Sequence, residues 1–183
     1  MKKIKFLFIL FLWFLPHSSW SKNNSNPNLI YSEFANNFND PIKIGDHNLK
    51  VFGLKIYFIE LFSDEAKFSY ENNLAIVINY QRNFQKNRLV ERSIQEISKL
   101  NNIQDKTLLD DYEKKLNEIF SDVKKGDRKT AYFNPKKGLK LYFNGQLVGE
   151  INDLVFAKRF MDIWLNSDSA YPQMTKDITA KNE

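Results

Sequence analysis

Residues 129–151 read KTAYFNPKKGLKLYFNGQLVGEI, and this stretch carries the clearest structural signal in the chain. Asn144-Gly145 lies between two largely apolar runs, and a type I′ hairpin turn needs the positive φ that Asn and Gly tolerate. Asn134 and Pro135 mark an earlier turn. The stretch therefore predicts three successive antiparallel strands, at 129–133, 138–143 and 146–151.

Strand-like patterns also occur on the N-terminal side of this meander. Strand-like alternation begins at Ile42, residues 54–62 read LKIYFIELF, and residues 74–80 read LAIVINY. The last two runs are apolar at nearly every position, whereas a strand with one solvent-exposed face would alternate apolar and polar residues. We therefore expect a sheet with both faces covered, or with one face lining a cavity.

Helical spacing occurs in three places. Between 87 and 100, and again between 106 and 120, apolar residues recur every three or four positions. Asn152 or Asp153 can cap a last helix whose apolar side ends at Trp164. Strands and helices are segregated along the chain, which predicts an α+β fold with an antiparallel sheet and helices packed on one face.

The N-terminus has the three parts of a secretory signal peptide. Three lysines precede the apolar run FLFILFLWFL at 6–15, and Ser19-Trp20-Ser21 offers small residues for a cut after Ser21. A membrane-spanning helix needs about 20 apolar residues, twice the length of this run, although a retained anchor stays the alternative. A cleaved signal predicts a periplasmic or secreted protein without a stable membrane span.

Removing residues 1–21 leaves a nearly balanced charge. The full chain has 27 basic and 22 acidic residues, and the first 21 residues hold three lysines and no acid, which leaves 24 basic and 22 acidic residues. This balance gives little support to nucleic-acid binding, and none is predicted. The chain has no cysteine, so an exported form depends on its packed core without disulfides.

The length suits one domain. We predict a signal peptide at 1–21, followed by a flexible N-terminal segment at 22–41 that begins with the polar sequence KNNSNPN. The folded domain then covers 42–172, and the polar end at 173–183 is predicted to be a disordered tail.

Few residues suited to catalysis or metal binding remain in the mature chain. His47 is its one histidine, and it lies between Asp46 and Asn48 in an expected turn. With no cysteine and one histidine, neither a zinc site nor a Ser-His-Asp nucleophile is predicted, and no phosphate-binding glycine motif occurs. We therefore predict no metal and no cofactor.

Aromatic residues make up 15% of the chain, and they either fill the core or line a pocket for a hydrophobic ligand.

Three segments form an ordered pattern along the chain. They read GDHNLKVFGLKIYFIELFS at 45–63, IFSDVKKGDRKTAYFNPKKGLKLYFNGQLVGEI at 119–151 and DLVFAKRFMDIWLN at 153–166. In this order they resemble the chalcone isomerase-like domain of bacterial exported proteins. The matching positions are Gly45, Leu49, Lys55, Tyr57, Leu61, Val123, Gly126, Asp127, Asn144, Gly145, Phe156, Ala157, Phe160, Ile163, Trp164 and Leu165. The resemblance covers about residues 42–172 and implies an open-faced β-sandwich, in agreement with the predicted order of elements.

The resemblance implies a fold that hosts two kinds of protein. Plant enzymes of this fold close a chalcone ring to a flavanone, and other relatives bind fatty acids without that activity. The enzyme needs a cation and hydroxyl donors around a reacting phenolate. Where the family has an arginine, this chain has Asn48, with Lys50 nearby. The enzyme's strand threonine aligns with Phe52 and its helix serine or threonine with Asp162, so these positions argue against flavanone chemistry.

The first functional hypothesis is an exported, non-catalytic domain that binds a small hydrophobic ligand such as a fatty acid. Its basis is an aromatic-rich sheet with two apolar faces, together with the lack of a recognisable set of catalytic residues in the sequence. The predicted ligand-binding residues are Phe52, Tyr57, Tyr80 and Arg82.

Two alternatives stay open. One is an intramolecular lyase of the chalcone isomerase type, for which the resemblance places the catalytic positions at Asn48, Lys50 and Asp162. The other is an interaction module for a second envelope protein. Its contact surface would be the polar side of the first predicted helix, with Arg88, Arg92 and Lys99.

Overall fold

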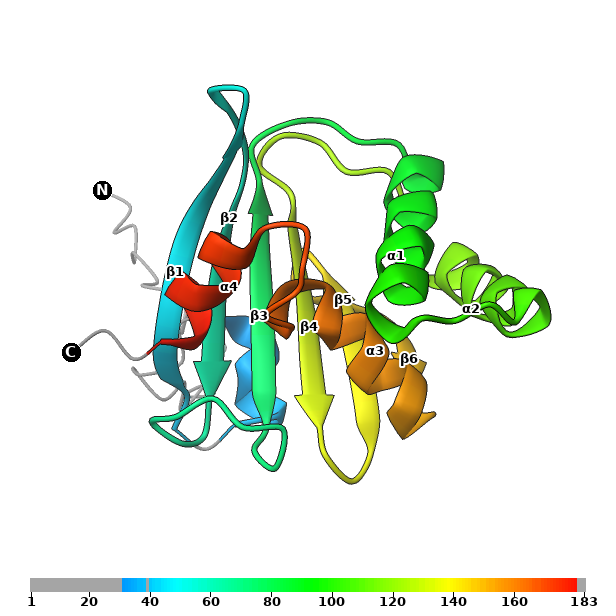
Figure 1. The fold of residues 1–183 in the computed structure, drawn as a ribbon. Coiled ribbons are helices and arrows are strands. Elements are labelled where there is room, and N and C mark those ends of the chain that lie inside the picture. Colours follow the sequence, from blue (N-terminus) through cyan, green and yellow to red (C-terminus); the bar gives the residue numbers. More distant parts are fainter. Residues whose placement is uncertain (1–30, 39, 181–183) are drawn as a thin grey trace, which may run out of the picture.

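A six-stranded antiparallel sheet forms the centre of the computed structural model, which describes residues 31–38 and 40–180 (Figure 1). The strands follow one another in chain order, so that each pairs with its neighbours in the sequence. They are β1 (Ile42–Val51), β2 (Leu54–Ser63), β3 (Leu74–Tyr80), β4 (Arg128–Asn134), β5 (Gly138–Phe143) and β6 (Gln146–Ile151). The predicted antiparallel meander is confirmed.

Four α-helices accompany the sheet. They are α1 (Lys86–Asn101), α2 (Lys106–Ile119), α3 (Leu154–Leu165) and α4 (Pro172–Thr179). The first two connect β3 to β4, and the last two follow β6. Helices α3 and α4 lie over one face of the sheet, here called the front face, whereas α1 lies beside the sheet against α2 and α3, and α2 also contacts β6 (Figure 1). The predicted α+β class, with helices packed on one face, is confirmed.

The hairpin turn and the helix cap form where the sequence predicted them. Asn144 and Gly145 have φ values of 49° and 85°, and the residues on either side of them, Phe143 and Gln146, are paired across the hairpin. Asp153 caps α3, because its carboxylate accepts hydrogen bonds from the backbone N–H groups of Val155 and Phe156 at 2.8 and 3.0 Å. These contacts fix where β6 returns and where α3 begins.

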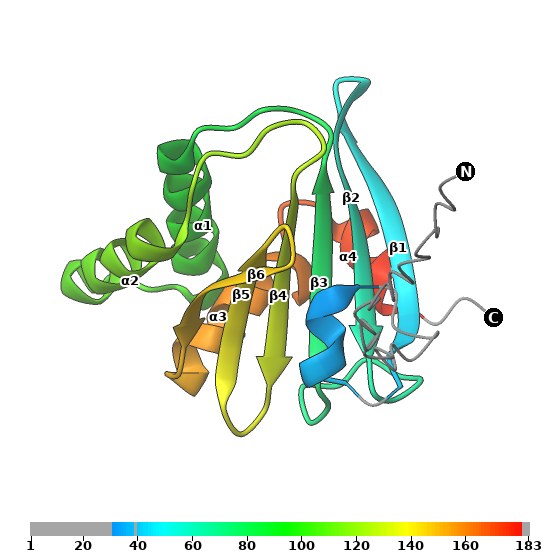
Figure 2. The same cartoon turned by 180° about the vertical axis from the view of Figure 1, so that it is seen from behind.

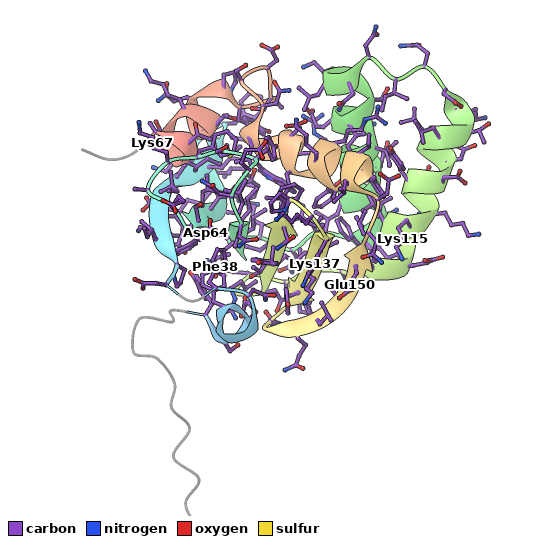
Figure 3. The ribbon with its side chains drawn as sticks, turned by 90° about the horizontal axis from the view of Figure 1, so that it is seen from below. Phe38, Asp64, Lys67, Lys115, Lys137 and Glu150 are labelled. Carbon is purple, nitrogen blue, oxygen red and sulfur yellow. The ribbon has the colours of Figure 1, made fainter. Side chains whose placement is uncertain are left out.

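The sheet is apolar on both faces. Along β3, Leu74, Ile76, Ile78 and Tyr80 belong to the front core, and Ala75 and Val77 belong to a second core on the back face. A short 3₁₀ helix, η1 (Ser32–Asn36), covers this back face (Figure 2). Seen from below, η1 and the helices α3 and α4 lie on opposite sides of the sheet (Figure 3).

Polar contacts fasten η1 to the back of the sheet. The guanidinium of Arg128 donates to the buried carboxylate of Glu33 at 3.0 Å, and the Thr130 hydroxyl donates to the same group. Burial alone would raise the pKa of Glu33, yet the hydrogen bonds from Thr130 and Arg128 lower it below its usual value. Tyr31 donates a hydrogen bond to Glu60, which is also buried.

The flexible segment predicted at 22–41 is wrong for residues 31–38. Phe34 and Phe38 are buried against Phe62 and Tyr132 of the back core, so this part is folded. The prediction rested on the polar residues that precede Tyr31 and did not weigh the aromatic spacing that follows. Residues 1–30, which include the predicted signal peptide, lie outside the described part of the chain.

The disordered tail predicted at 173–183 is wrong for residues up to 179, because α4 packs on β1 and β2. Met174 and Ile178, one helical turn apart, are almost completely buried. The contact is close at Gly45, where an added Cβ would lie 2.3 Å from the backbone oxygen of Asp177. In the described ranges no helix is long and apolar enough to span a membrane.

Replacing Ile178 with alanine should lower the free energy of unfolding by about 2–4 kcal/mol, because it removes buried methyl groups and leaves a cavity between α4 and β1. Chemical denaturation measures this change. Ile42→Ala is the matched control, since Ile42 is on β1 but 41% exposed. Equal, small losses for both variants would mean that α4 does not contribute to the core.

Candidate functional site

A cavity of about 340 Å³ lies between the front face of the sheet and the helices α1, α3 and α4. Its position follows from how the helices pack. Helix α4 contacts β1 and β2, α3 contacts β4, β5 and β6, and α1 contacts α3. The centre of the front face therefore has no helix directly upon it. The cavity volume falls at the lower end of the range of about 300–1,000 Å³ that is typical of small-molecule sites.

Most of the cavity wall is apolar. The sheet provides aliphatic side chains, and the helices and their connections provide aromatic side chains opposite them. The apolar lining residues, apart from tyrosines, are Leu49, Ile56, Ile76, Ile78, Phe84, Leu89, Phe120, Ala131, Leu141, Phe160, Ile163, Trp164, Ala170 and Met174. Such a wall favours a hydrophobic guest, because each buried methylene group contributes about 0.8 kcal/mol.

Tyr57 and Tyr80 line the cavity, as the sequence predicted for ligand-binding residues. They face each other across the β2–β3 pair, with ring centroids 6.3 Å apart and an edge-to-face arrangement. The Tyr57 hydroxyl donates to Sδ of Met174 at 3.5 Å. Burial raises the pKa of both phenols above the usual value, so the cavity holds neutral hydroxyl groups at ordinary pH.

Phe52 and Arg82 do not line the cavity, and the prediction for them is corrected. Phe52 is fully exposed at the two-residue turn between β1 and β2, where it has a φ of 49° and is followed by Gly53 with a φ of 77°. The resemblance predicts a strand position for Phe52, whereas Phe52 and Gly53 instead form the turn. Arg82 is exposed because β3 ends at Tyr80 and the chain then leaves the sheet.

The three catalytic positions suggested by the resemblance are not brought together at the cavity. Asn48 and Lys50 are exposed on β1. Asp162 is buried, but its carboxylate accepts hydrogen bonds from the hydroxyl of Tyr70 at 2.6 Å and from Nζ of Lys158 at 3.0 Å. None of the three lines the cavity, so this geometry offers them no shared substrate.

Lys129 is a cavity-lining cation that the sequence analysis missed. Its Nζ lies 3.9 Å from the ring centroid of Phe120, and among the described residues it has no hydrogen-bond partner. Burial lowers the pKa of Lys129 to about 8, and the attraction of Asp127 opposes only part of this shift. The alternation of side chains along β4 places Lys129 on the same face of the sheet as Ala131 and Phe133, and this could be read from the sequence. Alternation alone does not show which face of the sheet holds the cavity.

The predicted interaction surface on α1 is partly the rim of this cavity. Arg88 and Arg92 line it, and each is paired along the helix, Arg88 with Glu91 at 3.0 Å and Arg92 with Glu96 at 2.6 Å. Lys99 is exposed farther along α1 and does not line the cavity. Glu96, which the sequence analysis also missed, is 4% exposed and forms part of the wall.

The described part of the chain contains no cluster of three or more His, Cys, Asp or Glu side chains that could hold a metal ion. His47 lies in β1 instead of the expected turn, and its Nδ1 is 2.7 Å from the carboxylate of Asp177 on α4. This pair connects α4 to the first strand and lies away from the cavity lining.

An antiparallel sheet, covering helices and an apolar compartment between them define an open-faced β-sandwich. The chain belongs to the chalcone isomerase-like family, whose model matches residues 37–178. This match confirms the family expected from the three sequence segments.

The fold is similar to that of a fatty-acid binding protein of Arabidopsis thaliana known from its crystal structure. The alignment has a TM-score of 0.55 and 10% sequence identity, and it covers 76% of this chain and 86% of that chain. At this identity the likeness establishes a common fold. No curated protein sequence matches the chain.

Replacing Lys129 with methionine should change how stability depends on pH. Because burial lowers the pKa of Lys129 to about 8, the folded protein holds a disfavoured charge below pH 8, whereas the unfolded chain keeps this lysine protonated up to about pH 10. Between these values the unfolded state binds more protons. The free energy of unfolding of the unmodified protein should therefore rise relative to that of Lys129→Met from pH 8 to pH 10.

Denaturant titrations at pH 7, 8, 9 and 10 measure this difference. Lys115→Met, on the outer side of α2, controls for the loss of a lysine (Figure 3). A constant difference between Lys129→Met and the unmodified protein across this interval would contradict the burial of a charge at Lys129.

Proposed function

We propose that this protein is a non-catalytic binding protein for one small hydrophobic molecule of the fatty-acid type. The observation that carries the proposal is the cavity of about 340 Å³, whose wall is mainly aliphatic and aromatic. The cavity is bounded by well-packed helices and strands on the flanks of the front face, so a guest would be removed from water along most of its length. The similar protein from Arabidopsis thaliana is itself described as a fatty-acid binding protein.

The intramolecular lyase alternative has less support from this geometry. The reaction requires donors arranged around a developing anion, and the donors must lie where the substrate binds. Asn48 and Lys50 are on the exposed part of β1, and Asp162 is occupied by Tyr70 and Lys158. A chalcone absorbance assay tests this half of the proposal, and turnover by the purified protein would contradict it.

A delipidated preparation should be stabilised by medium-chain fatty acids. At a ligand concentration about one hundred times the Kd, binding stabilises the folded state by about 2.7 kcal/mol, which raises the Tm of a protein of this size by about 5–10 °C. Differential scanning fluorimetry with decanoic and dodecanoic acids measures the shift. The absence of any shift across a fatty-acid series would rule out this ligand class.

The variant Leu89→Trp should abolish the shift, because Leu89 lines the cavity from α1 and a larger side chain would fill it. Leu108→Trp on α2 is the matched control. Leu108 is also partly buried against the front core but does not line the cavity. Equal ligand-induced shifts in both variants would place the ligand elsewhere on the protein.

We also propose that the protein is exported and that its signal peptide is removed. Support comes from the three N-terminal lysines, the ten-residue apolar run at 6–15 and the small residues before position 22. Expression of the full chain in a bacterial host should yield a periplasmic protein that begins at Lys22. Intact-mass measurement and N-terminal sequencing identify the cut, and a full-length protein in the membrane fraction would favour the retained anchor.

A further inference from the structure

Two buried polar atoms of opposite charge lack partners within the same cavity. Nζ of Lys129 and Oε2 of Glu96 have no hydrogen-bond partner among the described residues, and both side chains line the cavity. A buried polar group without a partner destabilises the folded state, and more so when the group is charged. The free protein therefore carries two unfavourable groups at the place where a ligand would bind.

The two groups come from separate walls of the cavity and do not satisfy each other. Lys129 is on β4, where its Nζ lies over the ring of Phe120, and Glu96 is on α1. One oxygen of Glu96 is held by Arg92 at 2.6 Å, which leaves the other oxygen as a free acceptor. The wall thus offers one cationic donor and one separate acceptor.

The charges around the cavity leave one positive charge uncompensated. Arg92 is paired with Glu96 and Arg88 with Glu91, while Tyr57 and Tyr80 contribute neutral hydroxyls. Asp127, at the N-terminal side of β4, attracts Lys129 but forms its own hydrogen bonds with Asn144 and the backbone of Lys124. A ligand with a single negative charge would therefore complement the site.

We propose that the cavity selects an acidic amphiphile that also carries a hydroxyl group near its head, such as a hydroxy fatty acid. The carboxylate accepts hydrogen bonds from Lys129, and the hydroxyl donates to the free oxygen of Glu96. This inference rests on the proposed binding of a hydrophobic molecule and adds the chemistry of its head group. An acid without a hydroxyl would leave the Glu96 oxygen unsatisfied, and a neutral alcohol would leave Lys129 without an anion.

A set of ligands with the same ten-carbon chain separates these contributions. Isothermal titration calorimetry on the delipidated mature protein compares β-hydroxydecanoic acid, decanoic acid, decanol and methyl decanoate. Decanoic acid should bind at least about tenfold more tightly than decanol or the methyl ester, because a charge-assisted hydrogen bond is worth about 1.5–3 kcal/mol. β-Hydroxydecanoic acid should bind more tightly still, by about fivefold to tenfold.

Two variants assign these preferences to residues. Lys129→Met should remove the preference for the acid over the alcohol, and Glu96→Met, whose side chain has no strong hydrogen-bond acceptor, should remove the preference for the hydroxylated acid. Lys115→Met and Glu118→Met are the matched controls, since these residues form an exposed pair on α2 and should leave both preferences unchanged. Denaturation curves for each variant establish that it is folded, and the comparison of ligands on the unmodified protein does not depend on any variant.

The outcomes distinguish this inference from the proposed function. Equal binding of the acid, the alcohol and the ester would overturn the role of Lys129 while still supporting a hydrophobic binding protein. Equal binding of the two acids, or a hydroxyl preference that survives Glu96→Met, would overturn the role of Glu96. If none of the four compounds binds, both the proposed function and the head-group assignment are wrong.

Discussion

The front face of the six-stranded sheet must be covered by helices, and the helices reach its two flanks but not its centre. Helix α4 packs on β1 and β2, α3 packs on β4 to β6, and α1 packs on α3. Because apolar side chains from β3 and its neighbours still point to this side, the uncovered centre becomes an apolar compartment. The cavity is thus a consequence of helix placement, and most of its wall residues belong to strands or helices that also make contacts outside the cavity.

The packed core on the back face stabilises the sheet, although the front face has an unfilled cavity. There, η1 closes a core of aromatic and aliphatic side chains, and the ion pair between Arg128 and Glu33 holds the segment in place. Alternating residues of the same strands serve the two faces, with Ala75 and Val77 behind and Ile76 and Ile78 in front. A filled back core can stabilise the sheet while the front face keeps space for a guest.

The sequence predicted the fold more fully than the site because the two depend on different ranges of interaction. The Asn144-Gly145 turn, the Asp153 cap and the helical stripes are local patterns, and all of them were found. Short elements such as η1 and α4 were missed because only a few buried residues mark each one.

Tyr57 and Tyr80 were found through the alternation of β2 and β3, whereas Phe52 was misplaced because the turn residue Gly53 was not used. Glu96 and Lys129 approach one cavity only after α1 is packed, which no local pattern encodes.

The distribution of satisfied and unsatisfied polar groups distinguishes the cavity from the rest of the interior. Glu33, Glu60 and Asp162 are buried acids outside the cavity lining, and each has a hydrogen-bond donor from another side chain. In the part of the chain that the structure describes, three buried side-chain atoms lack partners, and two of them, on Lys129 and Glu96, belong to the cavity wall. A fold that pairs its other buried acids but leaves a lysine and a glutamate oxygen free in an apolar compartment concentrates its unfavourable groups where a ligand can relieve them. Under the proposed binding function, stability and binding are therefore opposed at this cavity, and the same two side chains contribute to both.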